Sequence, residues 1–181
     1  QLREIARRGY EAVGLDQSSE MLRYLEERAH EEGVMIETVE ADMTSFTLRE
    51  KVDFAFIMMG TISCIESNET FLSHLDSVAG VLKSGGLYLI ENLRLDWASN
   101  DFFGFQSWTM EREGIQVKTT YRVEVKDTLT QVLTEKMTLD LKDHGKRLLL
   151  EERRETKMIF PQEFLTLVAL NGEFEFIGWF E

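Results

Sequence analysis

The most constraining feature of the sequence is an alternation of short apolar runs with amphipathic helical segments over its first 95 residues. The runs have the length and composition of buried strands, and the segments between them place an apolar residue at every third or fourth position. We assign the strands to 11–16, 35–42, 52–59 and 87–93. Such alternation is typical of a mostly parallel sheet with helices on both faces, so the first half predicts an α/β fold.

The helices between these strands have recognisable ends. Residues 1–8 have the pattern of an amphipathic helix that stops at a glycine. Ser18 is placed to cap a second helix, which ends at Gly33. The apolar stripe from Phe71 to Leu82 predicts a third helix.

The pattern changes after residue 95. Residues 115–127 alternate apolar and polar side chains, which is typical of an antiparallel strand with one solvated face. Segment 132–141 repeats this pattern and 147–160 is assigned as a third strand, so we predict a three-stranded antiparallel insert. Pro161 suits the first position of a further helix, and 173–180 is predicted as a last strand. The expected organisation is one domain, 1–181, with an α/β part (1–95), an insert (103–160) and a return helix and strand (161–181).

Composition excludes several classes of partner and site. The formal net charge of −13 repels phosphate backbones, so no nucleic-acid partner is expected. No apolar run approaches membrane-spanning length, and no Cys/His cluster has metal-ligand spacing. The single cysteine, Cys64, precludes an internal disulfide and fits a cytoplasmic location. The sequence makes no prediction of oligomeric state.

Two aspartates stand where neighbouring strands end. Asp16 closes the strand at 11–16, and Asp42 closes the strand at 35–42. In a parallel sheet, ligands bind outside the carboxyl ends of the strands. An ionised carboxylate only accepts hydrogen bonds, so Asp16 could hold two ribose hydroxyls and Asp42 an exocyclic amine. Taken singly, each could be a cap or turn residue, but the pair favours a nucleoside site.

Five segments of the chain carry a resemblance to a known family. They are ARRGYEAVGLDQSSEMLRYLEERA (6–29), VEADM (39–43), VDFAFIMMGTISCI (52–65), LDSVAGVLKSGGLYLIEN (75–92) and FPQEFLTLVALNGEFEFIGWF (160–180). Their order and spacing resemble class I S-adenosylmethionine-dependent methyltransferases, and the resemblance covers nearly the whole chain. The later insert and 160–180 resemble the small-molecule branch, which includes glycine and sarcosine N-methyltransferases. Ser84 stands where that family commonly has proline.

The resemblance implies a Rossmann-like fold and S-adenosylmethionine as the cofactor. Asp16 would bind the ribose hydroxyls, and Asp42 would accept from the adenine amine. The remaining implied contacts are with the ribose and adenine edge, the adenine ring and the methionine part of the cofactor. The cofactor-binding set is Asp16, Gln17, Met21, Asp42, Met43, Met59 and Gly60, with Met58 equally well explained by core packing.

A small-molecule methyl acceptor is implied on the other side of the site. The substrate set is Thr61, Ser63, Asn92, Trp108 and Tyr121, the last two being equally plausible as core of the insert. Methyl transfer needs a general base only if the acceptor must lose a proton, and no base is assigned. The three histidines are interpreted as structural or surface residues: His30, His74 and His144.

The glycine-rich turn of this family would fall immediately before Gln1 in the resemblance. We therefore expect a chain truncated before the helix that follows that turn and before the last strand, and we expect this fragment to bind the cofactor poorly. Two alternatives stay open. One is a nicotinamide-dependent Rossmann oxidoreductase, which also needs an acid after its second strand, and the other is a catalytically silent methyltransferase-like binding subunit.

Overall fold

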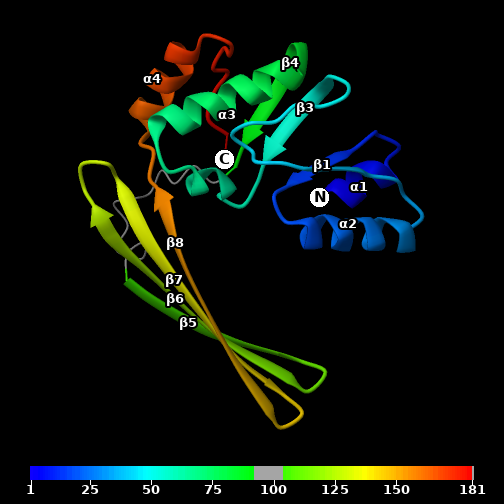
Figure 1. The fold of residues 1–181 in the computed structure, drawn as a ribbon, viewed down its shortest axis with the longest axis vertical. Coiled ribbons are helices and arrows are strands. Elements are labelled where there is room, and N and C mark those ends of the chain that lie inside the picture. Colours follow the sequence, from blue (N-terminus) through cyan, green and yellow to red (C-terminus); the bar gives the residue numbers. More distant parts are fainter. Residues whose placement is uncertain (92–103, 181) are drawn as a thin grey trace.

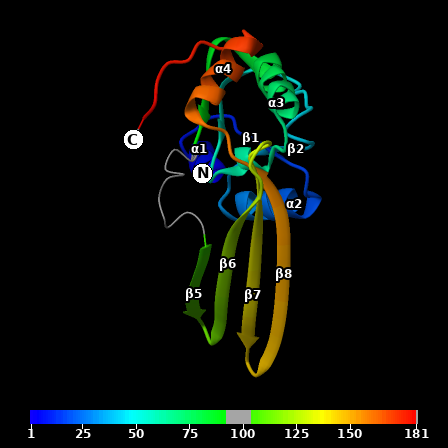
Figure 2. The ribbon, with the colours of Figure 1, turned by 90° about the vertical axis from the view of Figure 1, so that its left-hand side faces the viewer.

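The computed structural model describes residues 1–91 and 104–180 (Figure 1). Two parallel strand pairs and their helices form one part of the molecule, and a long antiparallel sheet projects from it (Figures 1 and 2). No helix in these ranges is long and apolar enough to cross a membrane. The helices are α1 (Leu2–Arg7), α2 (Ser19–Glu31), the 3₁₀ helix η1 (Thr61–Cys64), α3 (Asn68–Val81) and α4 (Pro161–Asn171).

Four strands form in the predicted order in the first half, but β4 begins five residues earlier than predicted and the strands pair as two separate units. Parallel pairs join β1 (Val13–Asp16) to β2 (Glu37–Glu40), and β3 (Val52–Ile57) to β4 (Leu82–Ile90). Within the described residues no ladder links β1 to β3, so each pair keeps an open edge. The expectation of a single continuous sheet is therefore not met by residues 1–91.

The helix termini follow the local signals in the sequence. The Ser18 hydroxyl accepts a hydrogen bond from the Met21 amide at 3.3 Å and caps α2. Pro161 occupies the first turn of α4, where a missing amide hydrogen is harmless. The third helix begins earlier than its apolar stripe indicates, because Ser67 caps it by accepting from the Thr70 amide at 3.1 Å.

The main core lies where η1, α3, α4 and the segment that ends the insert meet. Phe71 on α3 is fully buried, and its ring meets Phe164 on α4 edge to face at 6.0 Å between centroids. This packing places the chain after the insert back against the parallel part (Figure 1). The buried members of the cluster are Ile62, Ile65, Phe71, Leu75, Ile159, Phe164, Leu167 and Val168.

The insert has four antiparallel strands, so the prediction of three was wrong. The missed strand is β5 (Gly104–Arg112), whose apolar residues do not follow a strict two-residue period. It pairs with β6 (Ile115–Asp127) across a two-residue turn at Glu113 and Gly114, both with positive φ. The sheet continues through β7 (Val132–Asp143) and β8 (Lys146–Lys157) in the order β5-β6-β7-β8.

The predicted last strand at 173–180 does not form. These residues pack through aromatic side chains instead of joining a ladder. Phe176 and Trp179 lie 5.0 Å apart between ring centroids, and Trp179 lies 5.5 Å from Phe164 on α4. The apolar pattern of 173–180 therefore indicates contact with the core, and both a strand and an irregular segment can make such a contact.

Candidate functional site

The parallel pair β1–β2 brings two carboxylates to one edge of the structure. Asp16 is the last residue of β1 and pairs in register with Glu40, the last residue of β2. The Asp16 carbonyl also accepts a hydrogen bond from the Ala41 amide at 3.1 Å. Asp42 follows directly, and both aspartate side chains are exposed. The structure thus places Asp16 and Asp42 at adjacent strand ends.

Asp16 is held by the turn that starts α2. Its Oδ1 accepts from the Ser18 amide at 2.9 Å, while Oδ2 takes no hydrogen bond from the described residues. The side chains of Gln17 and Met21 are exposed beside it, in the turn and the first turn of α2. One carboxylate oxygen therefore orients Asp16, and the other remains able to accept hydroxyl groups.

Asp42 is held by the residue two positions after it. Its Oδ1 accepts from the Thr44 hydroxyl at 2.6 Å and from the Thr44 amide at 2.7 Å. The Thr44 hydroxyl and then the Thr44 amide lower the pKa of Asp42, and the nearby His74 adds a smaller effect in the same direction. Asp42 is thus an ionised acceptor at neutral pH.

Helix α3 contacts the turn at residues 42–45, a connection that the sequence interpretation missed. His74 Nδ1 lies 2.7 Å from the Met43 carbonyl oxygen. The hydroxyls of Ser73 and Ser77 donate to the Thr44 carbonyl oxygen at 2.7 and 3.2 Å. The spacing 73, 74 and 77 puts these side chains on neighbouring positions of one helix face, but nothing in the sequence identifies their partner.

A second loop, between β3 and η1, contains Met59 and Gly60. Met59 has φ 56° and is 79% exposed, and Gly60 is buried with φ 72°. The left-handed conformation is uncommon for a residue with a β-carbon. The Glu91 carboxylate accepts from the Met59 amide at 2.8 Å and holds the loop against the end of β4. Glu91 was not predicted.

The hydroxyls of the predicted substrate residues in this loop serve local structure. Thr61 donates to the Met58 carbonyl at 2.9 Å, and Ser63 donates to the Gly60 carbonyl at 2.8 Å. Both bonds stabilise the entry into η1. Asn92 lies outside the described residues.

The insert approaches η1 through one face of its sheet. The pairings of Trp108 with Thr119 and of Tyr121 with Met137 place Trp108 and Tyr121 on the same face. The pairing of β7 with β8 places Arg154 on that face too, and its Nη1 lies 3.9 Å from the Cys64 sulfur in η1. The face that bears both predicted aromatic residues is thus the one that meets η1.

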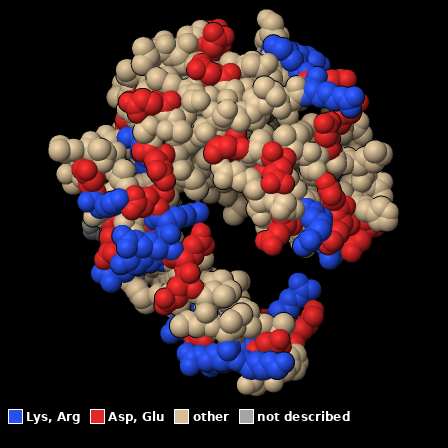
Figure 3. Space-filling model, viewed as in Figure 1, with Lys and Arg blue, Asp and Glu red and all other residues tan. Residues whose placement is uncertain are grey.

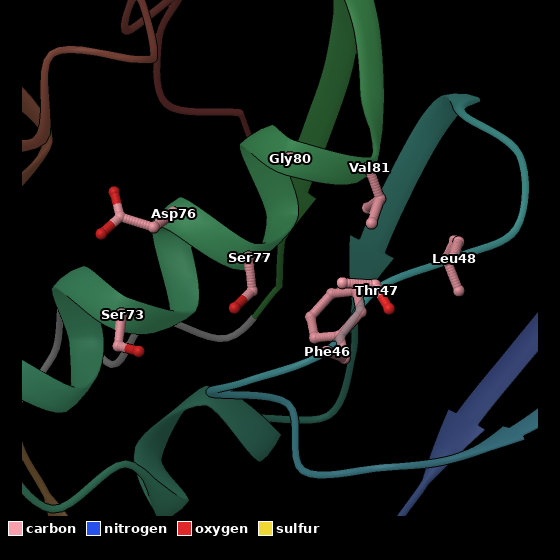
Figure 4. A pocket seen from close by; sticks show the side chains of 8 residues that line it. All are labelled: Phe46, Thr47, Leu48, Ser73, Asp76, Ser77, Gly80 and Val81. Carbon is pink, nitrogen blue, oxygen red and sulfur yellow. The ribbon is translucent and has the colours of Figure 1, made fainter.

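A cavity of about 410 Å³ lies beside α3, and it is not formed by the predicted site residues. Figure 4 shows Ser73 and Ser77 on the side of α3 that faces Phe46, while Asp76 points away from it. The cavity therefore lies behind the turn at 42–45 rather than at the Asp16 and Asp42 edge. No group of three His, Cys, Asp or Glu side chains within 1–91 and 104–180 could hold a metal ion.

Charge is unevenly divided between the two parts of the chain. The segment 104–157 contains 11 of the 20 Lys and Arg residues and 10 of the 33 Asp and Glu residues, which gives it a net charge of +1. The remainder carries −14, so the strand-end aspartates stand in the acidic part. Figure 3 shows basic side chains gathered over the projecting sheet, and a hollow between that sheet and the rest of the molecule.

Comparisons with known proteins agree with this arrangement. The family model described as a methyltransferase domain matches residues 1–86, which include β1 to β3 and both strand-end aspartates. The comparison with curated proteins finds no match.

The solved structures that are similar along most of the chain include three methyltransferases. An S-adenosylmethionine-dependent methyltransferase from Clostridium acetobutylicum has a TM-score of 0.76 at 13% identity and covers 92% of this chain and 65% of its own. The sugar N-methyltransferase KedS8 from Streptoalloteichus has a TM-score of 0.64 at 20% identity, with 94% and 76% covered. CalS10, an S-adenosylmethionine-bound amino pentose methyltransferase from Micromonospora echinaspora, has a TM-score of 0.68 at 17% identity, with 90% and 65% covered.

These likenesses are to the fold, since the sequence identities are low. The chain spans 65% of the length of the Clostridium and Micromonospora proteins. Residues 1–86 match a methyltransferase domain, and the chain as a whole has the fold of S-adenosylmethionine-dependent methyltransferases.

Proposed function

We propose that the protein transfers a methyl group from S-adenosylmethionine to a small-molecule acceptor. The observation that carries this proposal is the pair Asp16 and Asp42 at adjacent strand ends, inside the segment that matches a methyltransferase domain. Such an edge is where open α/β sheets bind nucleotides.

The residues present fit this cofactor. Asp16 offers an oxygen that no described residue occupies, which suits ribose hydroxyls. Asp42 is ionised and exposed, which suits an exocyclic amine. The acidic part of the chain that holds both is complementary to a cationic sulfonium. Gln17, Met21 and Met43 would line the nucleoside, and Met59 and Gly60 the amino-acid end.

S-Adenosylmethionine supplies a methyl group already activated for displacement. The chain's own contribution is then to align the acceptor and to exclude water. The loop held by Glu91 and the insert face with Trp108 and Tyr121 are the elements we propose for the acceptor, with Thr61 and Ser63 at the loop. No described residue is assigned as a general base.

A small metabolite is the proposed acceptor class. KedS8 is a sugar N-methyltransferase and CalS10 an amino pentose methyltransferase, so amines are the first acceptors to test. The glycine and sarcosine type named from the sequence stays part of this proposal. A reducing cytosol stays the expected compartment, because the chain holds a single cysteine.

Isothermal titration of the full-length protein with S-adenosylhomocysteine tests the cofactor assignment. We expect micromolar binding in the wild type and at least about a thirtyfold loss in Asp16→Ala, because two hydrogen bonds to a charged acceptor are removed. Glu27→Ala is the matched control, since Glu27 is an exposed acid on α2 whose Arg23 partner lies at 3.9 Å. Equal affinity of Asp16→Ala and wild type would contradict the ribose assignment.

The same titration with NAD⁺ and NADH tests the alternative that the protein is a nicotinamide-dependent oxidoreductase. Binding of these dinucleotides, with none of S-adenosylhomocysteine, would overturn the proposal. Methyl transfer to pooled amines and hydroxylated metabolites then separates an enzyme from a silent binding subunit.

A further inference from the structure

We propose that His74 is a positioning residue that holds Asp42 where it can accept a hydrogen bond from the adenine amine. Residues 42–45, which we call the adenine-side turn, carry Asp42, and His74 contacts that turn from α3. The inference rests on the proposed function and adds to it a residue outside the nucleoside-contacting set.

The hydrogen-bond partners of His74 determine which ring nitrogen carries the proton. Nδ1 lies 2.7 Å from the Met43 carbonyl oxygen, which can only accept, so Nδ1 must be the donor. Nε2 lies 2.6 Å from the Tyr88 hydroxyl oxygen, so a neutral ring accepts there from the Tyr88 O–H. Burial raises the pKa of Tyr88, which keeps its hydroxyl available as that donor.

His74 is buried, so both of its ring nitrogens need a hydrogen-bond partner. The His74 residue is only 3% exposed, and its ring centroid lies 6.4 Å from that of Phe71 and 5.7 Å from that of Tyr88. A buried imidazole is costly unless both nitrogens are paired, and an apolar side chain would pack at this helix position without that cost. The imidazole at this position therefore forms a hydrogen bond to the Met43 carbonyl that an apolar side chain could not form.

The adenine-side turn is held at a second carbonyl by the same helix. Ser73 and Ser77 donate to the Thr44 carbonyl oxygen at 2.7 and 3.2 Å. The Thr44 amide and hydroxyl in turn hold Asp42 Oδ1 at 2.7 and 2.6 Å. Helix α3 thus holds Thr44 in place, and Thr44 in turn orients the Asp42 carboxylate.

His74 also joins the two parallel strand pairs. Tyr88 lies in β4, which pairs with β3, whereas the adenine-side turn follows β2, which pairs with β1. His74 thus bonds to the Met43 carbonyl in the adenine-side turn and to the Tyr88 hydroxyl in β4. A change at His74 should therefore displace Asp42.

Titrations with S-adenosylhomocysteine and S-inosylhomocysteine test the role, because the second ligand has a carbonyl in place of the adenine amine. His74→Leu removes both bonds, and we expect it to weaken S-adenosylhomocysteine about tenfold and S-inosylhomocysteine less than about twofold. His74→Asn keeps an amide donor near the Nδ1 position, so we expect it to restore affinity to within about threefold of the wild type. Circular dichroism confirms that each variant is folded.

A double-mutant cycle with Asp42→Ala separates positioning from a general loss of structure. Once Asp42 is removed, we expect His74→Leu to weaken S-adenosylhomocysteine by less than about twofold further. If His74→Leu does not fold, Ser73→Ala takes its place in the cycle, since Ser73 is exposed and donates to the same turn. Its expected loss is about threefold, again only when Asp42 is present.

The possible outcomes separate this inference from the proposed function. A wild-type protein that binds no S-adenosylhomocysteine would overturn both. Binding that Asp42→Ala weakens, with His74→Leu and Ser73→Ala equal to the wild type, would overturn the positioning role alone. An equal loss with both ligands, or an undiminished loss in the Asp42→Ala background, would likewise overturn it. ¹⁵N NMR must also show the Nδ1–H form of His74.

Discussion

The ion pair between Glu135 and Arg154 allows a quantitative prediction about the attachment of the insert. Glu135 on β7 has a side chain that is only 3% exposed, whereas that of Arg154 on β8 is 46% exposed. Arg154 donates to Glu135 Oε2 through Nε at 2.8 Å and Nη2 at 2.7 Å. Thr156 donates to Oε1 at 3.2 Å. The pair lies beside η1, where Arg154 contacts Cys64.

Arg154→Met should destabilise the protein by about 2–3 kcal/mol at neutral pH. Removing one partner of a fully buried pair costs about 3–5 kcal/mol, because the remaining charge is uncompensated. A solvent-exposed pair contributes only about 0–1 kcal/mol. Since the acid is buried and the base is half-exposed, the expected loss lies between these limits. For a domain of this size it corresponds to a fall of about 4–12 °C in the melting temperature.

Urea and thermal denaturation followed by circular dichroism measure this loss. Arg147→Met is the matched control, because Arg147 donates to Asp140 Oδ1 and Oδ2 at 2.7 and 2.8 Å on the opposite face of the same sheet, where both side chains are more exposed than Glu135. We expect little change in that control. The double variant Glu135→Gln with Arg154→Met should recover more than half of the loss, because no buried charge is then left without its cation. Equal stabilities of Arg154→Met and Arg147→Met would refute the reasoning.

Three further predictions concern the core, the loop and pH. Phe71→Ala should cost about 3–5 kcal/mol in urea denaturation, because Phe71 is fully buried in the main cluster; a loss below about 1 kcal/mol would contradict that packing. Met59→Gly should raise stability by about 0.5–1 kcal/mol, since φ at Met59 is 56°, and a decrease would argue against the left-handed conformation. Burial holds the pKa of His74 below the ordinary histidine value of 6.5 despite the Met43 bond, so the unfolded chain takes up this proton first. Stability should therefore fall as pH drops below about 6.5, and His74→Gln should flatten this part of the profile; an unchanged slope would show that other groups cause it.

Local chemistry explains which parts of the fold could be predicted. Strand ends, caps and the proline at the start of α4 depend on a few adjacent residues, and the structure has Asp16, Ser18 and Pro161 in those positions. The strand at 104–112 was missed because its side chains break the two-residue period. It forms because a short turn aligns it with β6. The opposite error occurs at 173–180, where a strand was expected. This segment packs through its aromatic side chains and pairs with no other strand among the described residues.

The residues of the candidate site also fall into two groups, those that local sequence signals indicate and those that they do not. The position of Asp16 and Asp42 at adjacent strand ends could be predicted because both follow apolar strand runs, and their role in binding stays a prediction. Glu91, Ser73 and His74 act on backbone groups of distant turns, and the sequence contains no signal for which turn they meet. His74 was interpreted as structural, and the structure adds that its bond reaches the turn of Asp42.

Side-chain bonds from α3 reach both strand pairs of the candidate site. The edge with Asp16 and Asp42 follows β1 and β2, and the loop at Met59 follows β3. His74 bonds to the Met43 carbonyl beside Asp42 and to the Tyr88 hydroxyl in β4, and Ser73 donates to the Thr44 carbonyl. A ligand that contacts both Asp42 and the loop at Met59 would add a further connection between the pairs. Binding and the stability of these contacts should therefore be coupled, with each strengthening the other.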